Sequence, residues 1–161
     1  MTFDSLAFRK AMGTFATGVT VVTTRDAEGQ NCGVTVNSFA SVSLEPPLVL
    51  FCLDREAMSF GAFTGADRFA INFLAAEQHH LSIRFSVSAT DKWDGVAYDS
   101  WADDLPMLKG CLANLGCRRE AVYDGGDHVI IVGYVEDLRI SETREPLVYY
   151  QSGYRAIGPS L

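Results

Sequence analysis

Apolar residues run along much of this chain in short stretches with the length and spacing of β-strands. The longest uninterrupted stretch, Leu48 to Leu53, follows the break Glu45-Pro46-Pro47 and is long enough for one fully buried strand. Another long run, His128 to Ile140, follows the turn Asp124-Gly125-Gly126-Asp127. β-Branched or apolar patterns predict further strands over residues 19–24, 31–35, 68–74, 111–117, 119–123 and 147–151, and apolar positions alternate over residues 39–44. The chain is therefore expected to be rich in strands joined by turns.

Three shorter segments have the pattern of helices. The first begins at Asp4 or Ser5, either of which can cap a helix, and Gly18 is placed to end it. Its apolar positions fall on one helix face: Phe8, Ala11, Met12, Phe15 and Ala16. Short helices are also predicted over residues 59–64 and from about 77 to 85. Because no strand–helix–strand alternation is seen, the pattern predicts a single domain over residues 1–161. Its expected fold is an all-β-dominated antiparallel barrel of seven or eight strands with two or three short helices.

Residues 86–104 lack any periodicity and are expected to form a long surface loop. Loops longer than about 12 to 15 residues are often functional. The loop contains three large aromatic residues, Trp93, Tyr98 and Trp101. Two interpretations remain open: the rings form a lid over a site, or they attach the loop to the barrel.

Composition narrows the possible partners. The chain has 161 residues, 48% of them hydrophobic, and a formal net charge of −7. A net negative charge argues against nucleic acid and against an anionic membrane surface, because both attract dense basic faces. No stretch approaches the roughly 18 to 20 uncharged apolar residues of a membrane span. We therefore expect no nucleic-acid partner, no membrane association and a cytoplasmic location.

The chemistry-bearing motifs of several common enzyme classes are missing. No Gly-x-Gly-x-x-Gly follows a strand, and neither a phosphate-binding P-loop nor a Gly-x-Ser-x-Gly elbow occurs. The four cysteines form no Cys-x-x-Cys pair: Cys32, Cys52, Cys111 and Cys117. Buried free thiols in a reducing compartment fit this spacing best, and no metal site is expected.

Residues 8–24 and 33–49 resemble the opening of the flavin reductase-like family. The resemblance continues through residues 69–78, through Gly126-Asp127-His128 at the start of a strand, and through residues 146–150 with Gly153-Tyr154 behind them. It implies a flavin-binding split β-barrel, Greek-key-like and antiparallel, usually a homodimer with flavin near the subunit interface. It also implies hydride transfer from a reduced nicotinamide to FMN or FAD, with the reduced flavin often supplied to a partner monooxygenase.

The flavin ring needs main-chain donors and acceptors along one edge and an apolar wall behind it. By resemblance, the ring lies along the segment Thr35, Val36, Asn37, Ser38 and Phe39, and the strand that contains Cys52 lines the cavity. Without the resemblance, Asn37-Ser38 is equally well an ordinary turn between strands.

For the flavin phosphate, the resemblance points to the loop after the central strand and to the end of the second helix. These regions supply Ser59 and the pair Arg84-Phe85. A hydroxyl at a helix N-terminus and the planar fork of an arginine both suit phosphate oxygens. The alternative is that Arg84 is a solvated helix residue.

His128 is the candidate catalytic residue, because the family places its Gly-Asp-His histidine beside the nicotinamide. Tyr154 is a second candidate on the nicotinamide side, although tyrosines near the C-terminus also pack at dimer interfaces in this fold. His79 and His80 fall in a polar helix and are expected to face solvent.

The 86–104 loop carries Asp94, Asp99, Asp103 and Asp104 close to where an anionic nucleotide is expected to enter. NADPH needs a basic recess for its extra phosphate, so NADH is the expected donor.

Two other functions remain open. One is a flavin oxidase of the pyridoxamine-phosphate-oxidase type, and the other is a non-catalytic flavin-binding or redox-sensing module.

Overall fold

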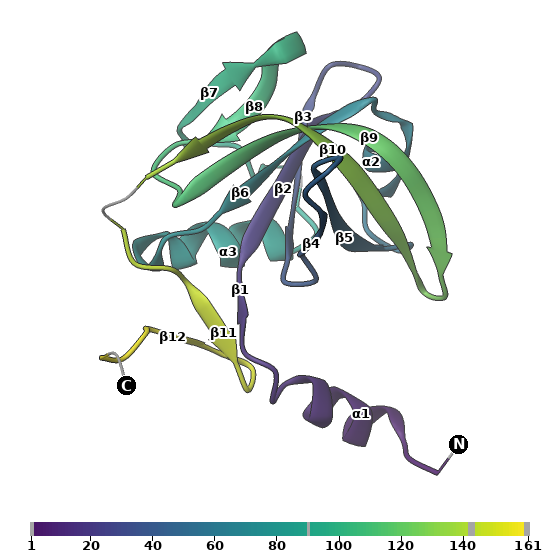
Figure 1. Ribbon diagram of the computed structural model, residues 1–161, viewed down its shortest axis with the longest axis vertical. Coiled ribbons are helices and arrows are strands. Elements are labelled where there is room, and N and C mark those ends of the chain that lie inside the picture. Colours follow the sequence, from purple (N-terminus) through teal and green to yellow (C-terminus); the bar gives the residue numbers. More distant parts are fainter. Residues whose placement is uncertain (1, 90, 142–143, 160–161) are drawn as a thin grey trace.

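A computed structural model describes residues 2–89, 91–141 and 144–159 (Figure 1). Its centre is a curved sheet of seven strands, in which every neighbouring pair is antiparallel. In spatial order the strands are β3 (Asn31–Val36), β2 (Thr20–Arg25), β6 (Arg68–Phe73), β9 (Ala113–Gly125), β10 (His128–Ile140), β5 (Leu48–Asp54) and β4 (Ala40–Ser43).

The two edge strands of this sheet are consecutive in the chain. Residues 37–39 alone connect β3 to β4. A fully extended residue spans at most about 3.3–3.6 Å, so this connection forces the two edges together and curls the sheet into a barrel. The expected all-β-dominated antiparallel barrel is confirmed.

Smaller elements surround the barrel. One three-stranded sheet consists of β1 (Thr17–Gly18), β11 (Val148–Tyr150) and β12 (Gly153–Arg155), and a hairpin consists of β7 (Tyr98–Trp101) and β8 (Leu105–Leu108). The helices are α1 (Ser5–Met12), α2 (Phe60–Gly65) and α3 (His79–Ser86), with 3-10 turns η1 (Ala76–Gln78) and η2 (Ala102–Asp104). Helix α3 packs against β2 and β3, whereas α1 projects away from the sheet at the N-terminal end (Figure 1). None of the helices in the described ranges has the length and apolar character that a bilayer crossing requires.

Strand β2 is buried on both faces, which explains its β-branched sequence. Side chains alternate between the faces of a strand, so Val22 points into the barrel, where it joins a cluster with Phe51 and Phe69. Val21 points the other way and joins a second cluster that includes Phe85 of α3. The barrel therefore has an inner core and an outer core that holds α3 in place.

The fully buried Asn72 of β6 connects four elements of the fold. Its Nδ2 donates to the Val21 carbonyl at 2.8 Å and to Thr23 Oγ1 at 3.2 Å. Its Oδ1 accepts from the Leu108 N–H at 2.9 Å and from Asn114 Nδ2 at 2.7 Å. Every polar atom of this amide has a partner, so its burial fixes the register of β2, β6, β8 and β9.

Three details differ from the sequence prediction. The strands expected at 111–117 and 119–123 are one continuous strand, β9, because Arg118 and Glu120 form an ion pair on its exposed face instead of ending it. The first helix ends at Met12 rather than near Gly18, since Thr17 and Gly18 pair with β11. The loop expected over 86–104 contains β7, which pairs with β8.

Candidate functional site

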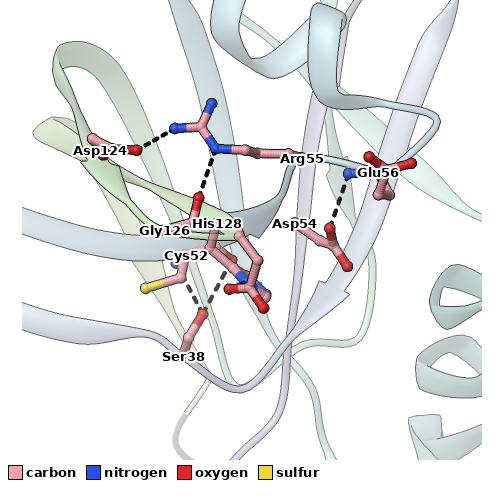
Figure 2. A network of polar contacts seen from close by, with 9 residues as sticks. Ser38, Cys52, Asp54, Arg55, Glu56, Asp124, Gly126 and His128 are labelled. Carbon is pink, nitrogen blue, oxygen red and sulfur yellow. Dashed lines mark hydrogen bonds and ion pairs between the residues drawn. The ribbon is translucent and has the colours of Figure 1, made fainter.

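The connection between β3 and β4 forms a seam in the barrel, and the predicted flavin-contacting segment lies on it. Ser38 Oγ accepts a hydrogen bond from the Cys52 N–H at 2.9 Å and lies 3.2 Å from the Cys52 carbonyl, to which it donates (Figure 2). Thr35 Oγ1 donates to the Ser82 carbonyl of α3 at 2.7 Å. The structure therefore brings Ser38 and Cys52 into contact, whereas Thr35 contacts α3.

The remaining seam residues divide between the core and two cavities. Val36 is buried in the inner core, so only its main chain faces outward. Phe39 packs edge-on against Phe73, with ring centroids 4.9 Å apart. Asn37 is exposed and borders an apolar cavity of about 380 Å³ and a second cavity of about 250 Å³. The seam thus offers an apolar wall next to polar main-chain groups.

Tyr154 lies in the smaller of these cavities, which is lined largely by hydroxyl groups. Its OH is 2.8 Å from the Oγ of Ser82, a residue that is only 1% exposed. Thr35 and Tyr149 complete the hydroxyl-rich lining. Tyr154 therefore shares a cavity with the seam residues, although its contacts are to α3 and β11 rather than to His128.

His128 occupies the rim on the other side of the seam. It is the first residue of β10 and pairs with Asp54 at the end of β5 (Figure 2). Strands β5 and β10 are neighbours, and their register places Ile130 opposite Cys52. His128 therefore lies two residues along β10 from the partner of Cys52. The ring of His128 is half-buried, and its Nδ1 lies 2.8 Å from Asp127 Oδ1. This hydrogen bond and the charge of His128 lower the pKa of the Asp127 carboxyl.

Ser59, the predicted phosphate donor, borders a cavity of about 440 Å³. Opposite it stand Lys92 and Trp93 from the 86–104 segment and Asn31 from β3. Two buried polar atoms of this cavity, Asn31 Oδ1 and Trp93 Nε1, have no hydrogen-bond partner in the part of the chain that the structure describes. Burial also lowers the pKa of Lys92. A cavity that combines a half-buried cation with unsatisfied polar atoms is suited to a polar ligand.

Arg84 and Phe85 do not line this cavity. Arg84 Nη1 donates to the Asp94 carbonyl at 2.5 Å, and its exposed side chain borders a separate hollow. Phe85 is fully buried, and a Cβ on Gly33 would lie 2.6 Å from its ring. The hollow beside Arg84 also contains Lys92, and the side chain of Phe85 belongs to the outer core.

The aromatic residues of the 86–104 segment attach it to the barrel. Trp93 packs edge-on against both Phe85 and Tyr98. Trp101 covers Gly116, where an added Cβ would lie 2.6 Å from the indole ring. Trp93 also borders the Ser59 cavity, so this single ring both attaches the segment and lines a candidate site.

The acidic residues of the same segment are dispersed. Asp99 is neutralised by Lys109, at 2.9 Å, and by Arg139, at 3.6 Å. The Asp103 side chain lies outside the part of the chain that the structure describes. The His128 rim is a further acidic region, since it carries Asp54 and Asp127. His79 and His80 are exposed, as expected.

Lys92, Trp93 and Asn31 are the site residues that sequence analysis missed in this role. A lysine beside a tryptophan in an otherwise acidic segment was the signal that could have identified them. With them, the chain meets each requirement of a flavin: main-chain groups and an apolar wall at the seam, and donors for an anion at Ser59 and Lys92. In the described part of the chain, no three histidine, cysteine or acidic side chains cluster as metal ligands.

Comparison with known proteins gives a consistent result. Residues 12–158 match the family model described as the flavin reductase like domain. The chain is 40% identical over 156 residues to the reductase subunit HsaB of a flavin-dependent monooxygenase from Rhodococcus jostii (strain RHA1), which covers 97% of this chain and 80% of that protein. It is 47% identical over 132 residues to the FMN reductase (NADH) SmoA of Agrobacterium fabrum (strain C58). This match covers 82% of this chain and 75% of SmoA.

Solved structures agree with these sequence matches. The NADH:FAD oxidoreductase SgcE6 of Streptomyces globisporus, in complex with NAD and FAD fragments, superimposes with a TM-score of 0.91 at 34% identity. The match covers 97% of this chain and 94% of that protein.

Proposed function

Because this chain belongs to the flavin reductase family, we propose that it transfers a hydride from NADH to FMN or FAD at the seam of its barrel. The observation that carries the proposal is that one continuous segment, β3 and the β3–β4 connection, runs along the candidate site. Its first residues, Asn31 to Gly33, line the Ser59 cavity, and Thr35 lines the Tyr154 cavity. Ser38 then joins β3 to Cys52, near the His128 rim.

A bound flavin supplies the hydride acceptor, and the protein supplies binding, orientation and protection from water. Strand β3 lies at an edge of the sheet, so one row of its N–H and C=O groups has no strand partner and is available to a planar ligand. Phe39 forms the apolar wall, and the hydrogen bonds of Ser38 to Cys52 keep the seam narrow.

We assign the flavin phosphate to Ser59 and Lys92. Lys92 carries the positive charge that an anion requires, and Asn31 and Trp93 line the same cavity, each with one buried polar atom that has no hydrogen-bond partner among the described residues. Lys92 replaces Arg84 as the basic donor, because Lys92 lines the Ser59 cavity and Arg84 does not, and the contact of Lys92 Nζ with the Phe85 carbonyl is long, at 3.4 Å. This local cation resolves the conflict between an acidic chain and an anionic ligand.

The nicotinamide side is assigned to His128 and Tyr154. His128 lies at the rim, where its ring can orient the carboxamide of the nicotinamide or exchange a proton with solvent. Tyr154 borders the seam from the opposite side through Asn37 and Thr35. NADH is the proposed donor, and the relative SmoA, an FMN reductase that uses NADH, supports it.

A homodimer is also part of the proposal, and helix α1 supports it. None of its residues is buried, and its apolar side chains Leu6, Phe8 and Met12 are between 51% and 74% exposed. An isolated helix of eight residues is unstable in water, so contact with a second copy gives α1 a reason to persist. Leu44, directly after β4, is a further exposed apolar side chain.

We further propose that the chain acts as one domain in the cytoplasm and passes reduced flavin to a separate oxygenase. The family match over residues 12–158 supports one domain. The four cysteines are free thiols, which suits a reducing compartment. The oxygenase partner is supported by HsaB, the reductase subunit of a flavin-dependent monooxygenase.

The test is NADH oxidation followed at 340 nm with FMN or FAD in excess, with NADPH as the alternative donor. Turnover that requires added flavin is the expected result, with NADH preferred. Flavin binding without NADH oxidation would instead identify a binding module. Oxygen consumption with an amine substrate and no nicotinamide would identify an oxidase.

A further inference from the structure

The loop that carries Ser59 and the turn that precedes His128 are joined by one arginine. Arg55 follows β5, and its main-chain N–H donates to the Asp127 carbonyl at 3.1 Å. Its Nε donates to the Gly126 carbonyl at 2.9 Å, and a terminal guanidinium nitrogen contacts the Asp124 carboxylate (Figure 2). Arg55 thus reaches both ends of the β9–β10 turn.

This turn has little rigidity of its own. Its two central residues are Gly126, which adopts a left-handed conformation with φ of 83°, and Asp127, and Gly125 precedes them as the last residue of β9. Glycine has more conformational freedom than any other residue, so the turn depends on outside contacts for a single position. His128 is the next residue but one after Gly126, and movement of the turn therefore moves the ring.

The loop on the other side is ordered by its own hydrogen bonds. The Glu56 N–H donates to Asp54 Oδ1 at 2.9 Å, and the Ala57 N–H donates to the Asp54 carbonyl at 3.1 Å. The Phe60 N–H then donates to the Ala57 carbonyl at 2.9 Å, which leads into α2. None of these bonds involves the side chain of Arg55, so the loop can serve as a fixed support for the turn.

We propose that Arg55 is a positioning residue for His128. Arg55 holds the β9–β10 turn against the ordered Ser59 loop and so fixes the place of His128 on the nicotinamide side of the site. The inference rests on the proposed function, since it assumes that His128 contacts the nicotinamide. The charge of Arg55 is secondary, because the Arg55 and Asp124 side chains are 42% and 81% exposed and exposed ion pairs contribute little. What matters is the guanidinium fork, which holds the Gly126 carbonyl and the Asp124 carboxylate at once.

The test combines Arg55→Met and Arg55→Lys with His128→Ala in a double-mutant cycle. We expect Arg55→Met to lower kcat/KM for NADH about fivefold, as the loss of one such set of hydrogen bonds implies. In the His128→Ala background the same change is expected to have little further effect, because the residue through which Arg55 acts is gone. Lysine carries the charge but not the fork, so Arg55→Lys is expected to recover only part of the loss.

Two measurements separate positioning from general destabilisation. The dissociation constant for FMN, measured by flavin fluorescence, is expected to change less than twofold in Arg55→Met. Amide hydrogen exchange of residues 125–128 is expected to become faster in Arg55→Met than in wild type, with or without ligands. Arg139→Met is the matched control, since Arg139 also pairs with an aspartate but at the opposite end of β10.

The possible results are distinct. If Arg55→Met has its full effect without His128, or weakens FMN as much as NADH, the positioning role is wrong. Unchanged exchange in the turn would also overturn it. If wild-type protein does not oxidise NADH at all, the proposed function fails, while the exchange measurement still decides whether Arg55 orders the turn.

Discussion

The two ends of the candidate site satisfy their polar groups in opposite ways. In the Ser59 cavity, buried Asn31 Oδ1 and Trp93 Nε1 have no partner in the described part of the chain, and burial lowers the pKa of Lys92. At the rim, His128 and Asp127 are more accessible, yet they contact each other. An unsatisfied buried group gains more from a ligand than a group that must exchange one partner for another. The cavity is thus suited to affinity and the rim to orientation of a transient partner.

The largest effect is expected at the cavity. Lys92→Met should weaken FMN binding about 30-fold, because a charge-assisted hydrogen bond contributes about 2 kcal/mol. Fluorescence titration measures the dissociation constant for FMN. Lys109→Met is the control, because Lys109 is exposed and paired with Asp99 outside the cavity. Equal weakening in both variants would mean that overall charge, not the cavity, controls affinity.

The rim should affect turnover instead. His128→Ala is expected to lower kcat/KM for NADH about tenfold, since it removes one orienting contact and no nucleophile. FMN affinity should remain within twofold of wild type. Steady-state kinetics with the concentrations of NADH and FMN both varied will separate kcat/KM for NADH from the KM for FMN. A loss of FMN affinity as large as that of Lys92→Met would end the distinction between the two regions.

A smaller effect on the cavity is expected from Ser59→Ala. A neutral hydroxyl contributes about 1 kcal/mol to a phosphate, so FMN should bind about fivefold more weakly. The same titration measures it, and Ser100→Ala, on the exposed strand β7, serves as the control. No change in affinity would leave Lys92 as the only assigned donor in the cavity.

The smallest effect concerns pH at the rim. The Asp127 pKa is lowered in the folded protein, so its contribution to stability is present above the ordinary value of 3.8 and is lost as the pH falls through the lower folded value. The melting temperatures of wild type and Asp127→Asn should therefore differ by about a degree at pH 5 and converge near pH 3. Melting curves at the two pH values test this, and a difference that grows toward pH 3 would contradict it.

The sequence predicted the strands whose apolar pattern is local, such as β5 and β10, and the barrel that follows from them. It divided β9 because Arg118 and Glu120 interrupt the pattern, although ion pairs on an open face accommodate both. Resemblance named Ser38 and Cys52 as flavin contacts, which stays a prediction, and the hydrogen bonds between the two residues are seen only in the structure. The sequence pattern missed Lys92, because the position of this residue depends on the packing of its neighbour Trp93 against Phe85 of α3.

The closure of the barrel has a consequence for the protein outside catalysis. A single serine side chain, not a full ladder of strand hydrogen bonds, joins the β3–β4 connection to Cys52. In the proposed placement, flavin bound along this joint would add its own binding free energy to the folded state, about 2.7 kcal/mol at a concentration of one hundred times its dissociation constant. Resistance to unfolding and proteolysis then rises and falls with the flavin supply, so the lifetime of the protein in the cell becomes a measure of how much flavin there is to reduce.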